Sequence, residues 1–132
     1  MHETKHTSAA RRRHRSALHW CHDGPRPGRE TRAGQCPIAC SREAQTQFDR
    51  AVALLHSFWY AEAVKGFTAT AETDPACAMS YWDIAMSLWY PLWQPPSEAM
   101  LKQGRGAVQQ ATAVGAKTER EQQYIAAIDG TL

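Results

Sequence analysis

Cysteine and histidine, residue types that often bind zinc in proteins, gather in the first third of this 132-residue chain. The candidate ligands are His19, Cys21, His22, Cys36 and Cys40. They are numerous enough for a tetrahedral site. However, no Cys-x-x-Cys pair is present, and the candidates flank a Pro/Gly-rich turn at residues 24–28. We therefore expect no metal ion and no other cofactor.

Residue patterns that would indicate catalysis are weak. Ser57 follows His56, but three aromatic residues come next, where a nucleophile elbow needs a glycine. The sequence also has no glycine-rich loop suited to holding a phosphate group. We therefore expect no enzymatic activity.

Basic residues concentrate toward the N-terminus. Residues 1–40 carry eight Lys and Arg against three Asp and Glu, whereas residues 41–132 carry seven against ten. Because residues 1–40 are charged and show no hydrophobic periodicity, we expect them to form a disordered basic arm. The basic run at residues 11–15 could bind nucleic acid or an anionic surface by counterion release. Without a binding fold or interleaved aromatics, we expect nucleic acid not to be the partner.

The strongest pattern in the chain is a self-similarity at a spacing of 34 residues. The residues Phe48, Asp49, Ala51, Leu54 and Trp59 recur as Trp82, Asp83, Ala85, Leu88 and Trp93. A fixed period of this length is typical of a helix–turn–helix repeat, which buries its apolar face by stacking on a neighbour. The period indicates a protein that holds a partner rather than one that makes or breaks a bond.

Hydrophobic periodicity and capping residues predict an all-α fold. The expected helices cover residues 42–56, 60–73, 76–90 and 98–114, with a fifth beginning after Thr118. Ser41 and Ser97 are the expected N-caps of the first and fourth helices. Thr118 with Glu121 forms a capping-box sequence for the fifth. The third helix is apolar on nearly every side, which predicts that it is central.

The helix residues also show a family resemblance. An aromatic, a small residue, an aromatic and a closing proline follow the first helix, in the order Tyr60, Ala63, Phe67 and Pro75. This order and spacing resemble the tetratricopeptide repeat, and segment 44–132 is similar to bacterial proteins of that family. The resemblance implies antiparallel helical hairpins stacked as a short solenoid of about two and a half repeats in residues 41–132.

In the resembled family, the first helix of each pair lines a concave groove that receives a protein or peptide partner. The residues at the corresponding positions are Phe48, Val52, Leu55, His56, Trp82, Met86, Trp89 and Tyr90. If this groove is the working surface, the large aromatics in it are exposed until a partner covers them. The alternative is that further repeats bury them.

The fifth helix matches only the first half of a third repeat, and no capping helix follows it. We therefore expect a fragment of a longer array, or a unit that self-associates through its uncapped end. The atypical arm could also come from a mis-assigned start. An alternative function is a basic-arm nucleic-acid or anionic-surface binder that uses the repeats only for self-association. With no membrane span and no export signal visible, we expect a cytoplasmic protein.

The four cysteines do not suggest a disulfide framework. Cys77 lies beside Pro75 in the region of the repeats, whereas the other three cysteines lie in the predicted arm. We therefore expect Cys77 to be a small buried side chain and no disulfide to form.

Overall fold

Helices fill most of the part of the chain that the computed structural model describes, residues 36–89 and 94–131. The helices of this part are α1 (Arg42–His56), α2 (Tyr60–Thr73), α3 (Ala78–Trp89), α4 (Glu98–Val114) and α5 (Glu119–Asp129). Within the described ranges there is no strand. The predicted all-α fold is confirmed. The basic run at residues 11–15, most of the expected arm, and Tyr90 at the expected end of the third helix lie outside the described residues.

Hydroxyl side chains cap three of the helices where the sequence predicts them. Ser41 Oγ accepts a hydrogen bond from the N–H of Ala44, and Ser97 Oγ accepts from Met100. Thr118 accepts from the N–H of Glu121 at the start of α5. The carboxylate of Glu121 has a longer-range partner, described below. Each cap satisfies an N–H group that the first helical turn leaves without a backbone partner.

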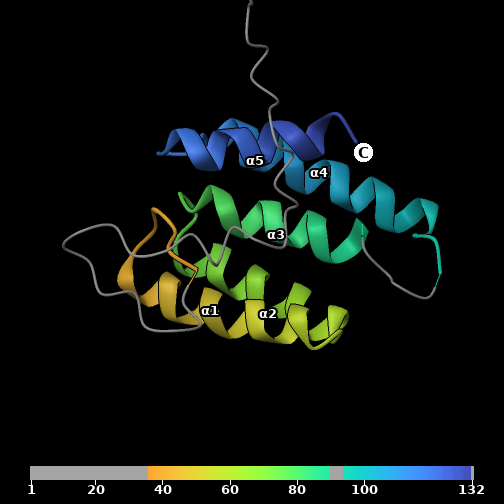
Figure 1. Cartoon of the computed structure of the whole chain (residues 1–132), viewed down its shortest axis with the longest axis horizontal. Coiled ribbons are helices and arrows are strands. Elements are labelled where there is room, and N and C mark those ends of the chain that lie inside the picture. Colours follow the sequence, from red (N-terminus) through yellow and green to blue (C-terminus); the bar gives the residue numbers. More distant parts are fainter. Residues whose placement is uncertain (1–35, 90–93, 132) are drawn as a thin grey trace, which may run out of the picture.

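α1 with α2 and α3 with α4 form two antiparallel hairpins, and α5 follows as a fifth helix (Figure 1). α1 packs on α2, α2 packs on α3, and α3 packs on α4, while α5 lies against both α3 and α4. α3 therefore has neighbours on several sides. This central position explains why α3 is apolar on nearly all of its faces.

Small residues mark the closest helix approach between α1 and α2. A Cβ atom placed on Gly66 would lie 2.8 Å from Cβ of Ala51, and Ala51 and Ala63 are both buried. Because Ala51 Cβ is fixed to the backbone, the contact cannot relax by a side-chain rotation. The repeat spacing thus places small residues where the two helices touch.

Two cysteines overturn the expectation that no disulfide forms. Cys40 and Cys77 are joined by a disulfide with their Cα atoms 5.1 Å apart. Cys36 is disulfide-bonded as well. The expectation failed because Cys77 lies in the turn before α3, and residues 36–40 fold back beside that turn.

Among the described helices, none is long and apolar enough to cross a membrane.

The close approach at Gly66 leads to a stability prediction. Replacing Gly66 with Ala should lower the free energy of unfolding by ~1–3 kcal/mol, because the added methyl overpacks the contact with Ala51. The matched control is Gly106→Ala, since nothing lies within 4 Å of a Cβ at Gly106 inside α4. There the better helix propensity of Ala should raise stability by ~0.5–1 kcal/mol. Urea unfolding would check both. Equal effects of the two substitutions would contradict the assigned packing.

Candidate functional site

The predicted groove residues divide into a buried and an accessible group. Phe48, Val52 and Trp82 are buried, Leu55, Met86 and Trp89 are half-buried, and His56 is exposed at the end of α1. Tyr90 lies outside the described residues. The apolar stripe of α1 and α3 is thus mostly core at its centre, with accessible surface toward the C-terminal ends of these helices.

Trp82 is covered by the chain itself rather than left open for a partner. Its side chain is 3 % exposed, and its indole N–H donates a hydrogen bond of 2.8 Å to the backbone carbonyl of Tyr124 in α5. The two aromatic rings also meet edge to face, with centroids 5.4 Å apart. The expectation that Trp82 is exposed in the groove is therefore wrong, because α5 covers it.

Phe48, the repeat counterpart of Trp82, is also buried by other parts of the chain. Phe48 is fully buried, and its ring lies 5.3 Å from the ring of Phe67 in α2. The 34-residue period therefore marks core positions at these two aromatics.

Residues 36–40, which the sequence analysis placed in the arm, lie against the helices, and we call this segment the strap. On the α1 side, the N–H of Cys36 donates to Asp49 Oδ1 at 3.1 Å, and the N–H of Ile38 donates to Gln45 Oε1 at 2.9 Å. The amide nitrogen of Gln45 in turn donates to the carbonyl of Cys36 at 2.8 Å. Gln45 thus contacts the strap as both acceptor and donor.

The other side of the strap is held by the first turn of α5. The N–H of Ala39 donates to Glu121 Oε1 at 2.8 Å, and the guanidinium of Arg120 donates to the carbonyl of Pro37. Glu121 is 2 % exposed, so this bond is shielded from water. We call the four side chains that hold the strap, Gln45, Asp49, Arg120 and Glu121, the clamp.

The clamp recognises main-chain groups of the strap. Its acceptors meet the N–H groups of residues 36, 38 and 39, and its donors meet the carbonyls of residues 36 and 37. Pro37, which has no N–H, occupies the strap position where no acceptor is needed. Bonds of this kind fix the backbone register of the strap and depend little on its side chains.

The clamp lies at one end of the stripe that carries the predicted groove residues. Gln45 is three residues before Phe48 and seven before Val52, so all three share one face of α1. Glu121 stands in the same relation to Tyr124 and Ile128 on α5. The clamp residues therefore lie on the same helix faces as the predicted groove residues, and the groove prediction covered only the apolar part of these faces.

Asp49 and Asp83 occupy the same position in successive repeats but differ in the hydrogen bonds that their carboxyl groups accept. Burial raises the pKa of Asp49 above its ordinary value of 3.8, while hydrogen bonds from Cys36 and Gln45 lower it. Burial alone raises the pKa of Asp83 well above that value, and its Oδ2 has no hydrogen-bond partner. The difference follows from the sequence, because the repeat counterpart of Gln45 is Met79, which offers no amide.

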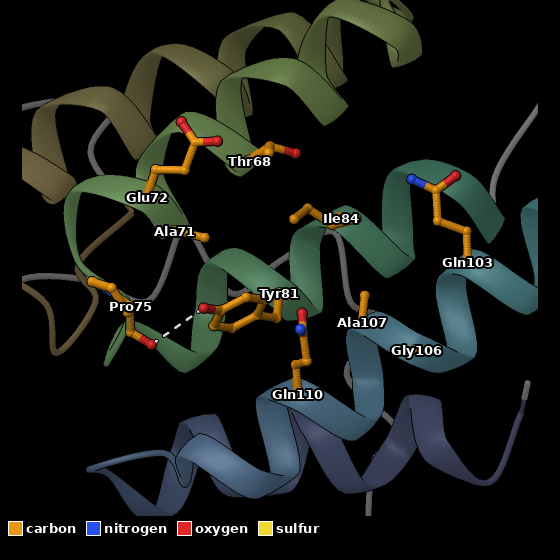
Figure 2. A pocket seen from close by; sticks show the side chains of 10 residues that line it. All are labelled: Thr68, Ala71, Glu72, Pro75, Tyr81, Ile84, Gln103, Gly106, Ala107 and Gln110. Atoms are coloured by element: carbon orange, nitrogen blue, oxygen red, sulfur yellow. Dashed lines mark hydrogen bonds between the residues drawn. The ribbon is translucent and has the colours of Figure 1, made fainter.

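A separate pocket of about 500 Å³ lies between α2, α3 and α4 (Figure 2). Ala71, Ile84 and Ala107 contribute apolar surface, and the amides of Gln103 and Gln110 contribute polar groups. Glu72 adds a carboxylate to this lining.

Metal binding finds no support in the described ranges, where no group of three or more His, Cys, Asp or Glu side chains is placed to hold an ion. Of the ligands weighed from the sequence, Cys36 and Cys40 are disulfide-bonded, and His19, Cys21 and His22 lie outside the described residues.

A scan against protein-family models and searches of curated proteins and solved structures found no match to this chain. The strap, the clamp and the helices that position them are the features of this chain from which a function can be inferred.

The burial of Trp82 gives a second prediction. Trp82→Ala should lower the free energy of unfolding by ~3–5 kcal/mol, because it removes a large core side chain and leaves a cavity beneath α5. Trp59→Ala serves as the control, since Trp59 is 63 % exposed and its removal should change stability by no more than ~0.5 kcal/mol. Thermal unfolding followed by circular dichroism would compare them. A fully stable Trp82→Ala protein would show that α5 does not cover this residue.

Asp83 gives a prediction about pH. A carboxyl whose folded-state pKa is raised stabilises the fold fully below its ordinary value, and this contribution is lost as pH rises toward the folded-state pKa. The asparagine of the Asp83→Asn variant does not ionise in this pH range. The stability of the variant relative to the parent should therefore increase from about pH 4 to about pH 7, reaching at least ~1 kcal/mol. Urea unfolding across this range would measure it.

A constant difference between Asp83→Asn and the parent at every pH would show that Asp83 is ionised or hydrated in the folded protein.

Proposed function

We propose that this chain is a non-catalytic protein-interaction module whose helical hairpins bind an extended segment of a partner protein. The observation that carries the proposal is the clamp around the strap. Side chains of α1 and α5 form five hydrogen bonds with the main chain of a five-residue stretch. These bonds to main-chain groups support a peptide segment as the ligand.

The chemistry of the clamp favours a peptide over a small molecule. Its acceptors meet the N–H groups of three strap residues, and its donors meet the carbonyls of two, so a ligand must offer both at peptide spacing. Three of the bonds involve the charged groups of Asp49, Glu121 and Arg120. Hydrogen bonds to charged groups contribute more than neutral ones, ~1.5–3 kcal/mol each against ~0.5–1.5.

The resemblance to the tetratricopeptide repeat supports the same proposal from the sequence. In that family the first helices of successive hairpins carry the binding face, and here the clamp residues all lie on α1 and α5, which occupy those places. The half-buried Leu55, Met86 and Trp89 continue the stripe beyond the clamp. We assign them to contacts with the side chains of a longer partner segment.

The test uses the full chain with the substitutions Cys40→Ser and Cys77→Ser, which free the strap from its tether. The probe is a fluorescein-labelled peptide of residues 35–41 with both cysteines replaced by serine, and its fluorescence anisotropy reports binding. We expect saturable binding. Asp49→Ala should weaken it by at least ~10-fold, because one charge-assisted bond is lost. Glu62→Ala, which removes an exposed carboxylate paired with Lys65, should leave it unchanged.

Changes in the peptide separate main-chain from side-chain recognition. A probe with proline at positions 38 and 39 lacks two N–H groups that the clamp accepts and should not bind. A probe with valine and glycine there keeps both N–H groups and should bind within a few-fold of the parent peptide. Absence of binding by every probe, or indifference to the Asp49→Ala change, would refute the proposed function.

A further inference from the structure

The strap occupies the clamp in the oxidised protein, and a disulfide holds it there. Cys40, the last strap residue, is bonded to Cys77 in the turn that precedes α3. We propose that the strap is an internal ligand, and that reduction of the Cys40–Cys77 bond opens the clamp to a segment of a partner protein. This inference rests on the proposed function, because it assumes that the clamp is the binding site.

The covalent tether adds to the noncovalent contacts that hold the strap. Fixing the backbone of one residue costs ~1–2 kcal/mol, which is similar to what each strap hydrogen bond contributes. The five bonds therefore roughly offset the cost of ordering five residues, and the burial of Cys36 and the packing of Ile38 against the core add to the hold on the strap. A tether makes rebinding intramolecular, so that a free partner segment competes against a high effective concentration. Cutting the tether on one side lowers that concentration.

The helices have their own support once the strap leaves. Ser41 caps α1 through its side chain, and that bond to Ala44 does not involve the strap. The N–H of Ser41 donates to Asp74 Oδ2 at 2.8 Å, which anchors the start of α1 to the turn before α3. The strap can thus pivot between residues 40 and 41 while α1 remains capped. The rings of Phe48, Phe67 and Trp82 keep their partners on the helices.

The redox step has a defined course. Cys40 is half-buried whereas Cys77 is fully buried, so a thiolate of a dithiol reductant attacks Sγ of Cys40. The Cys40–Cys77 bond breaks, a mixed disulfide forms at Cys40, and Cys77 leaves as a thiolate that takes up a proton. The second thiol of the reductant then displaces Cys40, which also takes up a proton. Two electrons pass to the protein, and the dithiol becomes a disulfide.

The experiment compares the oxidised and the reduced full-length chain with the cysteine-free probe peptide. We expect the oxidised chain to bind at least ~10-fold more weakly than the chain treated with dithiothreitol, because the strap competes more strongly when the disulfide as well as the peptide chain holds it. The reductant also acts on the disulfide of Cys36. The Cys40→Ser/Cys77→Ser chain therefore isolates the effect of the strap tether, and it should bind equally well with or without reductant.

A second variant tests occupancy with the tether intact. Ile38→Pro with Ala39→Pro removes the two strap N–H groups that Gln45 and Glu121 accept, so the oxidised variant should bind the probe. Circular dichroism of both variants should match the parent. Loss of helicity in the cysteine variant would show that the strap is a structural part of the fold and would overturn the inference.

The remaining outcomes separate this inference from the proposed function. Equal binding by the oxidised and reduced parent, together with binding by the cysteine variant, would overturn the gating and leave the peptide site standing. No binding by any form of the chain would overturn both.

Discussion

The burial of α3 is the constraint on which the rest of this structure depends. Nine of its residues are buried, among them Trp82, Ile84 and Leu88, and these lie on several faces of the helix. A helix without a polar face cannot lie on the surface with one side in water, so other elements must cover it on each side. The α1–α2 hairpin, α4 and α5 supply them (Figure 1). The repeats are therefore not independent units, because each one completes the core of the next.

Because the aromatic residues Phe48 and Trp82 are buried in the core, the candidate site consists of the polar side chains beside them. Trp82 is used to join α3 to α5, so it is not available as a binding surface. The polar side chains of the site lie near the N-terminal ends of α1 and α5, where Gln45 and Glu121 are on the same helix faces as the buried rings. Because the helices are fixed by their core, these side chains are held in place before any ligand arrives. Such preorganisation reduces the entropy that binding must overcome.

Local signals made much of the fold predictable. Ser41, Ser97 and Thr118 are capping residues by their chemistry, and the structure has them capping. The clamp was not predictable in this way, because its bonds join residues far apart in the chain. Ala39 and Glu121 are separated by 82 residues, and no periodicity links them. One signal was present: Gln45 is a polar residue on an otherwise apolar stripe, and such a residue needs a buried partner or a ligand.

The disulfide bears on where and when the strap can be closed. Disulfides persist in oxidising surroundings and are rare where glutathione and thioredoxin keep thiols reduced. The closed strap is therefore not the resting form expected in a permanently reducing cytoplasm. In oxidising surroundings the tether would keep the clamp filled by the chain itself.

Under the proposed function, recognition of main-chain groups by the clamp makes such a tether useful. A site that recognises N–H and carbonyl groups accepts many sequences, since every peptide carries them, and it gains selectivity only from register, from the position without an acceptor at Pro37, and from the fully buried position of Cys36. Permissive recognition leaves an open site exposed to unintended partners. An internal segment of the same chemistry blocks them without any change in the helices. Selectivity then depends less on the shape of the clamp than on the conditions that release its own chain.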